Sequence, residues 1–201
     1  MPQDHPRKNE MTRPGAGRKW VGALYEIADV ASLATLCGVV LLTFLLRFAG
    51  VDGTSMEPTL AGGQRLAVTA VLTRPARGDI VVLSPRNGHH KPLVKRVIAV
   101  AGEEIDLADG RVLIDGVPID EPYLPGGVMT YPAHGSPGDL AYPARVPAGH
   151  VFVMGDNRGG SSDSRSGMVG FVRADDIVGK VILRVKPFFA SKPFRFTFRV
   201  K

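Results

Sequence analysis

The chain has 201 residues, 44% hydrophobic and 22% charged, enough for one globular core with a short appendage but a tight fit for two full domains. Its single cysteine, Cys37, excludes an intramolecular disulfide and any cysteine-based metal site. The formal charge of +6 is spread thinly, with a net of +4 after residue 50 and no dense basic block, so no nucleic-acid partner is predicted.

The N-terminal residues 1–19 carry five basic and two acidic side chains, a net charge of +3. A cationic tail of this kind suits a position beside anionic lipid head groups. Next, Val30–Leu46 gives seventeen consecutive residues without a charge, near the lower limit for spanning a bilayer core, and Arg47 can extend it by snorkelling. Trp20 and Tyr25 precede this run, where aromatic residues often settle at a membrane interface.

A transmembrane signal anchor over residues 20–50 follows from this pattern, with the tail cytoplasmic and residues 51–201 forming an extracytoplasmic domain. Two alternatives stay open, a buried core helix and a signal peptide that is itself removed. The apolar run shows no polar face, which disfavours a core helix. Arg47 in Arg47-Phe48-Ala49 occupies a position where cleavage requires a small residue.

After the anchor the sequence predicts a mainly β domain, since 24 glycines and 16 prolines separate short segments rich in Val and Ile. Asp109-Gly110 and Asp115-Gly116 are typical hairpin turns. Eleven of the 29 positions in 121–149 are Pro or Gly, so an inserted, loop-rich region is expected at about 101–149. The aromatic and basic ending, within residues 186–201, fits an edge strand or a membrane-interface surface. The predicted strands are 65–72, 79–84, 93–100, 111–115, 150–155 and 177–185.

Ser55 lies in VDGTSMEPTL, where Gly53 gives backbone freedom and Pro58 restricts Glu57 to extended or turn geometry. Such a bend exposes a hydroxyl, although most serines near Gly and Pro are simply turn residues. A catalytic serine needs a base, and none of the five histidines lies in a recognised triad motif.

Lysine can serve as that base if apolar burial lowers its pKa. Alternation along LVKRVIAV places Lys95 on one face with Leu93, Val97 and Ala99, as the one polar member, while Arg96 falls on the other face. The alternative is that Lys95 lies on a solvated strand edge.

A third polar cluster, MGDNRGGSSDSRSG at 154–167, follows a strand. It is either a hydrophilic surface loop or a site-supporting loop, in which Asp163 pairs with Arg165 or Arg158 and a serine orients a lysine base. The spacing of its carboxylates does not match an EF-hand calcium loop.

In this order, SMEPTL, RGDIVVL, VKRVIAVAGE and GHVFVMGDNRGGSSDSR behind an N-terminal anchor resemble the sequence boxes of type I signal peptidases, over roughly residues 30–185. The resemblance implies an antiparallel β catalytic domain with a small inserted β and loop region. It also implies a membrane-bound serine endopeptidase that cuts signal peptides after Ala-x-Ala through an acyl-enzyme.

Roles for individual residues are implied by the same resemblance. Ser55 would be the nucleophile and Lys95 the general base, with Met56 lining the substrate cleft and Ser161 orienting the base. Backbone N–H groups at Gly53 and Ser55 would hold the oxyanion, as in the Gram-positive branch of the family. The supporting residues would be Asp156, Asn157, Arg158, Asp163 and Arg165.

The chain departs from the family pattern at Gly159 and Gly160, which follow GDNR where an acidic or polar residue and then asparagine are usual. Preproteins and the lipid bilayer are the expected partners, with no metal, no cofactor and no nucleic acid, and the oligomeric state is left open. Two rival interpretations remain: a cytosolic, self-cleaving Ser/Lys peptidase of the repressor type, and an anchored β module without activity.

Overall fold

The computed structural model describes residues 16–69, 74–85, 91–135 and 138–185, and the chain divides into two compact units, Met1–Thr43 and Phe44–Lys201. The first unit contains most of helix α1 (Ala16–Leu45). Within it, Trp20–Val40 is 21 residues long with a mean hydropathy of 1.6, and none of it is buried inside the protein. At 1.5 Å per residue it measures about 32 Å, the thickness of a bilayer core.

The helix differs from the predicted anchor at its C-terminal end. Residues 46–50 were expected to continue the anchor, but they form strand β1 (Leu46–Gly50), which pairs antiparallel with β2 (Arg65–Thr69). Phe48 faces Ala67 in this register. Hydrophobicity alone does not distinguish the two states here, because an edge strand and a helix end can both carry the apolar sequence LRFAG.

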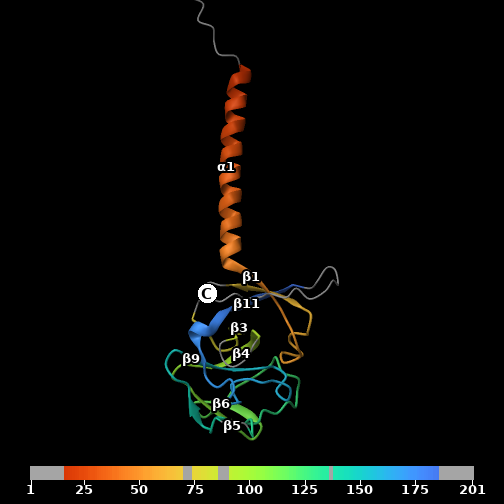
Figure 1. Cartoon of the computed structure of the whole chain (residues 1–201), viewed down its shortest axis with the longest axis vertical. Coiled ribbons are helices and arrows are strands. Elements are labelled where there is room, and N and C mark those ends of the chain that lie inside the picture. Colours follow the sequence, from red (N-terminus) through yellow and green to blue (C-terminus); the bar gives the residue numbers. More distant parts are fainter. Residues whose placement is uncertain (1–15, 70–73, 86–90, 136–137, 186–201) are drawn as a thin grey trace, which may run out of the picture. The chain divides into compact units, whose positions relative to one another are not determined.

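The second unit is built from two antiparallel sheets, in agreement with the mainly β prediction (Figure 1). The larger sheet has the strand order β1-β2-β11-β3-β4-β9-β10, so the last strand in the sequence lies between β2 and β3. Its remaining members are β3 (Ile80–Leu83), β4 (Leu93–Val100), β9 (His150–Met154), β10 (Val172–Arg173) and β11 (Ile177–Val185). A single 3₁₀ turn, η1 (Ala174–Asp176), precedes β11 in the described chain.

The smaller sheet belongs to the predicted insert and has the order β7-β6-β5-β8. Its strands are β5 (Glu104–Ala108), β6 (Arg111–Ile114), β7 (Val117–Pro118) and β8 (Ala144–Arg145). Both predicted turns are confirmed: Asp109-Gly110 and Asp115-Gly116 are two-residue connections in which every φ is positive, from 51° to 78°. This is the geometry that a tight hairpin with right-handed strand twist requires.

One hydrophobic cluster joins the two sheets, and another lies beneath the segment after β1. Phe152 of β9 is fully buried and makes edge-on ring contacts with Tyr142 and Phe171. A separate buried cluster contains Val51, Met56, Leu60, Leu66, Val68 and Val82. This second cluster fixes the 51–60 segment on the sheet.

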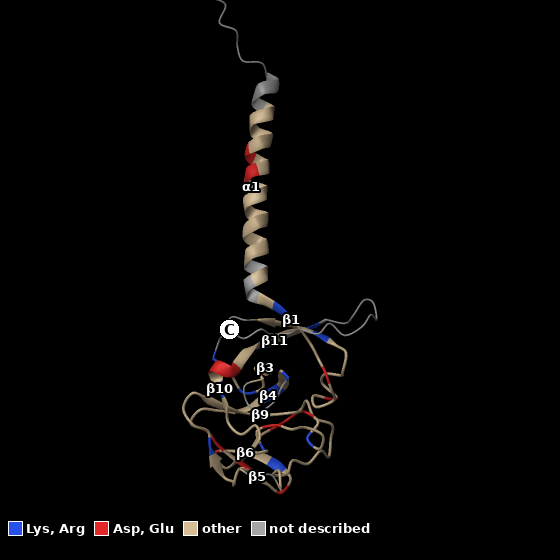
Figure 2. Ribbon diagram, viewed as in Figure 1, with Lys and Arg blue, Asp and Glu red and all other residues tan. Residues whose placement is uncertain are grey.

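Charged side chains of both signs are distributed over the β unit, as Figure 2 shows. Several of them are buried, including Lys95, Arg96, Asp156, Arg158, Asp163 and Arg165. Buried charges are costly unless they are paired, so their concentration in one region marks the place to examine for chemistry.

Candidate active site

The Ser55 segment is a turn between β1 and β2, anchored at both ends. Val51 N–H donates to the Gln64 carbonyl at 2.9 Å, and Leu60 N–H donates to the Met56 carbonyl at 2.8 Å. Met56, the neighbour of Ser55, is only 1% exposed and fills the core cluster beneath the turn. Ser55 itself is half-buried, so packing of its neighbour holds the hydroxyl in place while leaving it accessible.

Lys95 projects from β4 to the Ser55 hydroxyl. Its Nζ donates a hydrogen bond of 2.8 Å to Ser55 Oγ, although the two residues are 40 positions apart in the sequence. The lysine is 2% exposed, which decides between the two alternatives left open by the sequence in favour of burial. Val81 of β3 is its cross-strand neighbour.

Burial lowers the pKa of Lys95 from 10.5, because an apolar environment disfavours the ammonium form. The negative charges of Asp163 and Asp156 act in the opposite direction, and Arg165 reinforces the lowering. The net direction favours a neutral amine. A neutral amine beside a hydroxyl is able to accept its proton.

The loop after β9 brings Asp163 and Arg165 together. Arg165 Nε donates to Asp163 Oδ1 at 2.8 Å in a buried ion pair, as the sequence predicted. The other carboxylate oxygen accepts the Gly155 N–H at 2.9 Å. Arg165 also donates to the Arg158 carbonyl at 2.7 Å. Asp163 therefore supports the loop by binding the side chain of Arg165 and the backbone of Gly155.

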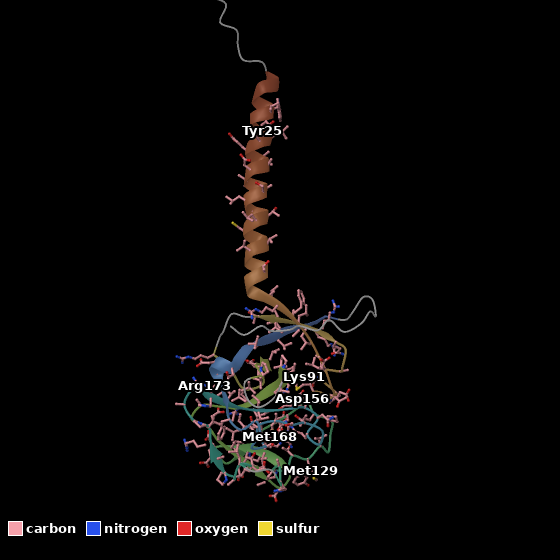
Figure 3. The ribbon with its side chains drawn as sticks, in the orientation of Figure 1. Tyr25, Lys91, Met129, Asp156, Met168 and Arg173 are labelled. Carbon is pink, nitrogen blue, oxygen red and sulfur yellow. The ribbon has the colours of Figure 1, made fainter. Side chains whose placement is uncertain are left out.

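Arg96 is buried and paired on the face of β4 opposite to Lys95. It is 7% exposed, its Nε and Nη2 donate to the two carboxylate oxygens of Asp156 at 2.8 and 2.7 Å, and its guanidinium lies 3.8 Å from the centroid of the Tyr123 ring. Figure 3 shows Asp156 within the β unit and Arg173 at its margin. Strand alternation indicated a different face from that of Lys95, but not that this face is buried too.

The insert reaches the site through Glu121 and Thr130, which sequence reasoning also missed. Both accept hydrogen bonds from Arg158, and the Glu121–Arg158 ion pair has a closest approach of 2.5 Å. No spacing rule links positions 37 residues apart when one lies in a loop-rich region. The available signal was the GDNR run at 155–158, because its arginine, Arg158, requires a carboxylate partner if it is buried.

Ser161, Gly53 and Met56 are three further predicted site residues. Ser161 Oγ is buried next to Gly155 and has no hydrogen-bond partner among the described residues, so a bond to Lys95 is not formed here. Gly53 is exposed with φ of +96°, a conformation that suits glycine. Met56 lies in the core cluster beneath the turn.

Beside the loop lies an open cavity of about 370 Å³, lined by Ser161, Asp163 and Arg165 on one side and by Met129, Tyr131 and His134 of the insert on the other. Across the described ranges no group of three His, Cys, Asp or Glu side chains is placed to hold a metal ion. The 2.8 Å contact between Lys95 and Ser55 joins a potential base to a potential nucleophile, an arrangement suited to acid–base and nucleophilic chemistry.

Comparison with known proteins finds matches to one family. Residues 24–186 match the family described as signal peptidase, peptidase S26. The chain is 37% identical over 153 residues to signal peptidase I of Bacillus licheniformis, covering 73% of this chain and 80% of the relative. It is 36% identical over 179 residues to signal peptidase I T of Bacillus subtilis (strain 168), covering 86% and 90%.

Among solved structures, a signal peptidase I from Enterococcus faecalis V583 is similar at 28% identity and a TM-score of 0.45, with 55% of this chain and 99% of that chain covered. The sequence matches define the class of the protein as a serine endopeptidase. The chain belongs to the signal peptidase family, peptidase S26.

Proposed function

We propose that Ser55 and Lys95 are the nucleophile and general base with which this family member cleaves signal peptides from preproteins. The observation that carries the proposal is the 2.8 Å hydrogen bond from Lys95 Nζ to Ser55 Oγ, made by a lysine that is 2% exposed. Burial lowers the pKa of that lysine, which is the condition for it to act as a base.

In the proposed reaction, neutral Lys95 accepts the Ser55 proton while Oγ attacks the carbonyl carbon of the scissile peptide bond. The C–N bond then breaks, the proton passes from Lys95 to the departing amine, and the acyl group remains on Ser55 as an ester. Water attacks the ester carbonyl carbon and loses a proton to Lys95. The bond between this carbon and Ser55 Oγ then breaks, Lys95 returns the proton to Oγ, and the signal peptide leaves with a new C-terminal carboxylate. No metal or cofactor takes part in these steps.

Backbone N–H groups at Gly53 and Ser55 are proposed to hold the oxyanion that forms on the carbonyl oxygen. Donors of this kind supply a large share of the electrostatic stabilisation in acyl transfer. The positive φ of Gly53 supports the proposal, because it permits a turn that a side chain would strain. Substrates would bind as an added strand and be cut after Ala-x-Ala, with Met56 beneath the cleft.

Five charged or polar residues of the loop after β9 are proposed to keep Ser55 and Lys95, the proposed catalytic dyad, in place. Ser161 is proposed to orient Lys95. Support comes from the buried Asp163–Arg165 pair and from Asn157, whose N–H donates to the Ser55 carbonyl at 3.0 Å. The five are Asp156, Asn157, Arg158, Asp163 and Arg165.

We further propose that α1 anchors the protein in the cell membrane, with residues 1–19 inside, the anchor segment running from residue 20 to the end of the helix at Leu45, and the β unit from β1 onward outside. The length and hydropathy of Trp20–Val40 support the span. On the β unit, Phe48 and Leu183 flank Ala67 on neighbouring strands and are 55% and 60% exposed. Exposed apolar side chains in one row fit contact with lipid.

The test is to incubate detergent-solubilised protein with a preprotein whose signal ends in Ala-x-Ala and to measure the mass of the product. The wild type is expected to cut after the last Ala, and Ser55→Ala and Lys95→Ala to leave the preprotein intact. Cleavage by all three proteins would contradict the proposed dyad. No cleavage by any of them with lipid present would favour an inactive, anchored β module.

A further inference from the structure

One segment of the insert, residues 121–131, contacts three buried arginines, two of which, Arg158 and Arg165, are proposed supporting residues of the site. Glu121 and Thr130 bind Arg158, the Tyr123 ring covers Arg96, and the Tyr131 carbonyl accepts a bond of 3.4 Å from Arg165. We propose that Glu121 is a positioning residue for the peptidase reaction, which acts through Arg158 on the backbone that supports Ser55. This inference rests on the proposed roles of Ser55 and Lys95.

The first step is the contact between Glu121 and Arg158. Arg158 Nη1 donates to Glu121 Oε2 at 3.0 Å and Nη2 donates to Oε1 at 2.5 Å, a bidentate arrangement that fixes direction as well as distance. The two side chains are 12% and 1% exposed, so water competes little for either charge. Tyr123 Oη donates to the same carboxylate at 2.5 Å.

The second step leads from Arg158 to Gly155. With its remaining donor, Nε, Arg158 binds the Gly155 carbonyl at 3.2 Å. The N–H of Gly155 is held by Asp163 at 2.9 Å, so both polar backbone groups of this glycine have a charged partner. The orientation of Arg158 therefore determines the position of a peptide unit at the end of β9.

The third step connects Gly155 to the proposed catalytic residues. A Cβ atom built at Gly155 would overlap Ser161 Oγ and the Ser55 carbonyl oxygen, which shows that both atoms lie against its Cα. Displacement of the Gly155 backbone would therefore shift the surface on which the turn that carries Ser55 packs. Small errors of position at a reacting group cost large factors in rate.

Charge makes Glu121 the sensitive member of this path. Arg158 is buried and stays cationic, and the neighbouring carboxylate raises its pKa further. Without Glu121 the guanidinium would lack its bidentate partner. The next carboxylate that acts on it is Asp156, which is already engaged by Arg96. We expect Arg158 to turn from Gly155 when the carboxylate is removed.

The experiment compares full-length Glu121→Gln with wild type in detergent, using the Ala-x-Ala preprotein. Active-site titration of Ser55 corrects each rate for the fraction of folded enzyme. We expect kcat to fall about tenfold while KM stays within about twofold, because the substrate is bound as before and the reacting groups are displaced. A merely structural role would lower the titrated fraction and leave the corrected kcat unchanged, and that result would overturn the inference.

A second variant guards against loss of folding in the first. Thr130→Val removes a neutral acceptor from the same guanidinium in a nearly isosteric way, and we expect a fall in corrected kcat of about two- to threefold. The matched control is Glu104→Gln, since Glu104 forms an exposed ion pair with Arg145 at 3.7 Å in the same insert. Its corrected kcat is expected to equal that of wild type.

The inference and the proposed function fail in different ways. Unchanged corrected kcat in Glu121→Gln, with Ser55→Ala inactive, would overturn the positioning role and leave the proposed roles of Ser55 and Lys95 standing. If Glu121→Gln does not fold, unchanged corrected kcat in Thr130→Val would do the same. Cleavage by Ser55→Ala would overturn the dyad, and the positioning role with it. Equal losses in Glu104→Gln and Glu121→Gln would also contradict the inference, since they would show an effect common to any altered carboxylate.

Discussion

The backbone N–H of Asn157 donates a hydrogen bond of 3.0 Å to the carbonyl oxygen of Ser55. The side-chain amide of the same asparagine donates to the Thr54 carbonyl at 3.3 Å. The loop after β9 thus binds two successive carbonyl groups of the turn that carries Ser55. Because the shorter of these bonds is made by the backbone, we expect the conformation of the loop to matter more to this junction than the identity of any one side chain.

Gly155→Ala tests this junction directly. The added methyl group would overlap Ser161 Oγ and the Ser55 carbonyl oxygen, neither of which is at the end of a long, flexible side chain. We expect preprotein cleavage to fall by at least about a hundredfold as the two segments separate. Gly159→Ala is the control, since nothing lies within 4 Å of its Cβ position, and it should retain near-normal rates. Equal activity in both variants would contradict the close packing.

The pH dependence of kcat/KM follows from the lowered pKa of Lys95. Activity should rise with pH as the ammonium loses its proton, with a midpoint below 10.5, the value for an exposed lysine. Lys95→Arg should be inactive across the whole range, because a guanidinium does not deprotonate. Lys180→Arg, at a partly exposed ion pair with Asp79, should keep the wild-type profile. A midpoint at or above 10.5 would argue against Lys95 as the base.

Replacing the base should increase stability. In the folded state the pKa of Lys95 is lowered, so below about 10.5 the unfolded chain binds more protons and the folded form loses stability as pH falls toward the lowered pKa. Lys95→Met removes this cost, about 1.4 kcal/mol for each unit of lowering. Urea unfolding at several pH values should show a gain that grows as pH falls and then levels off. A gain independent of pH would contradict the linkage.

Removing one partner of the buried Arg96–Asp156 ion pair should lower the free energy of unfolding strongly. Asp156→Ala leaves a guanidinium that is 7% exposed without its bidentate partner, and we expect a loss of about 3–5 kcal/mol in the free energy of unfolding. The double variant Arg96→Met with Asp156→Leu should lose less than the single variant. The exposed Arg173–Asp175 pair is the control, with less than about 1 kcal/mol expected. A double variant as unstable as the single one would contradict this account.

Local signals in the sequence predict much of the fold. The strands at 93–100 and 177–185 have the predicted bounds, and both Asp-Gly hairpins form, because strand alternation and turn geometry depend on adjacent residues. β5 was missed even though its buried and half-buried positions alternate, because two of its outward positions are acidic and weaken the strand signal. Residues 186–201, expected at an edge or interface, lie outside the described residues.

The sequence predicts which residues gather at the candidate site better than it predicts which of them are in contact. Ser55, Lys95 and the Asp163–Arg165 pair follow from motifs, and the structure brings them close together. The contacts between the loop after β9 and the insert do not follow from motifs, because Glu121 and Arg158 are brought together by the path of a loop that has few regular elements. Tertiary pairing of this type depends on where two distant segments fold, which no local spacing specifies.

The most direct measurement of the central claim is the site and rate of acylation by a serine-directed acylating probe, read by intact mass and peptide mapping. One acyl group should attach to Ser55 in the wild type, at a rate that rises with pH, and Lys95→Ala should slow it by at least about a hundredfold. Acylation at another serine, or at Ser55 with a rate that Lys95→Ala leaves unchanged, would contradict the proposal that Lys95 activates Ser55.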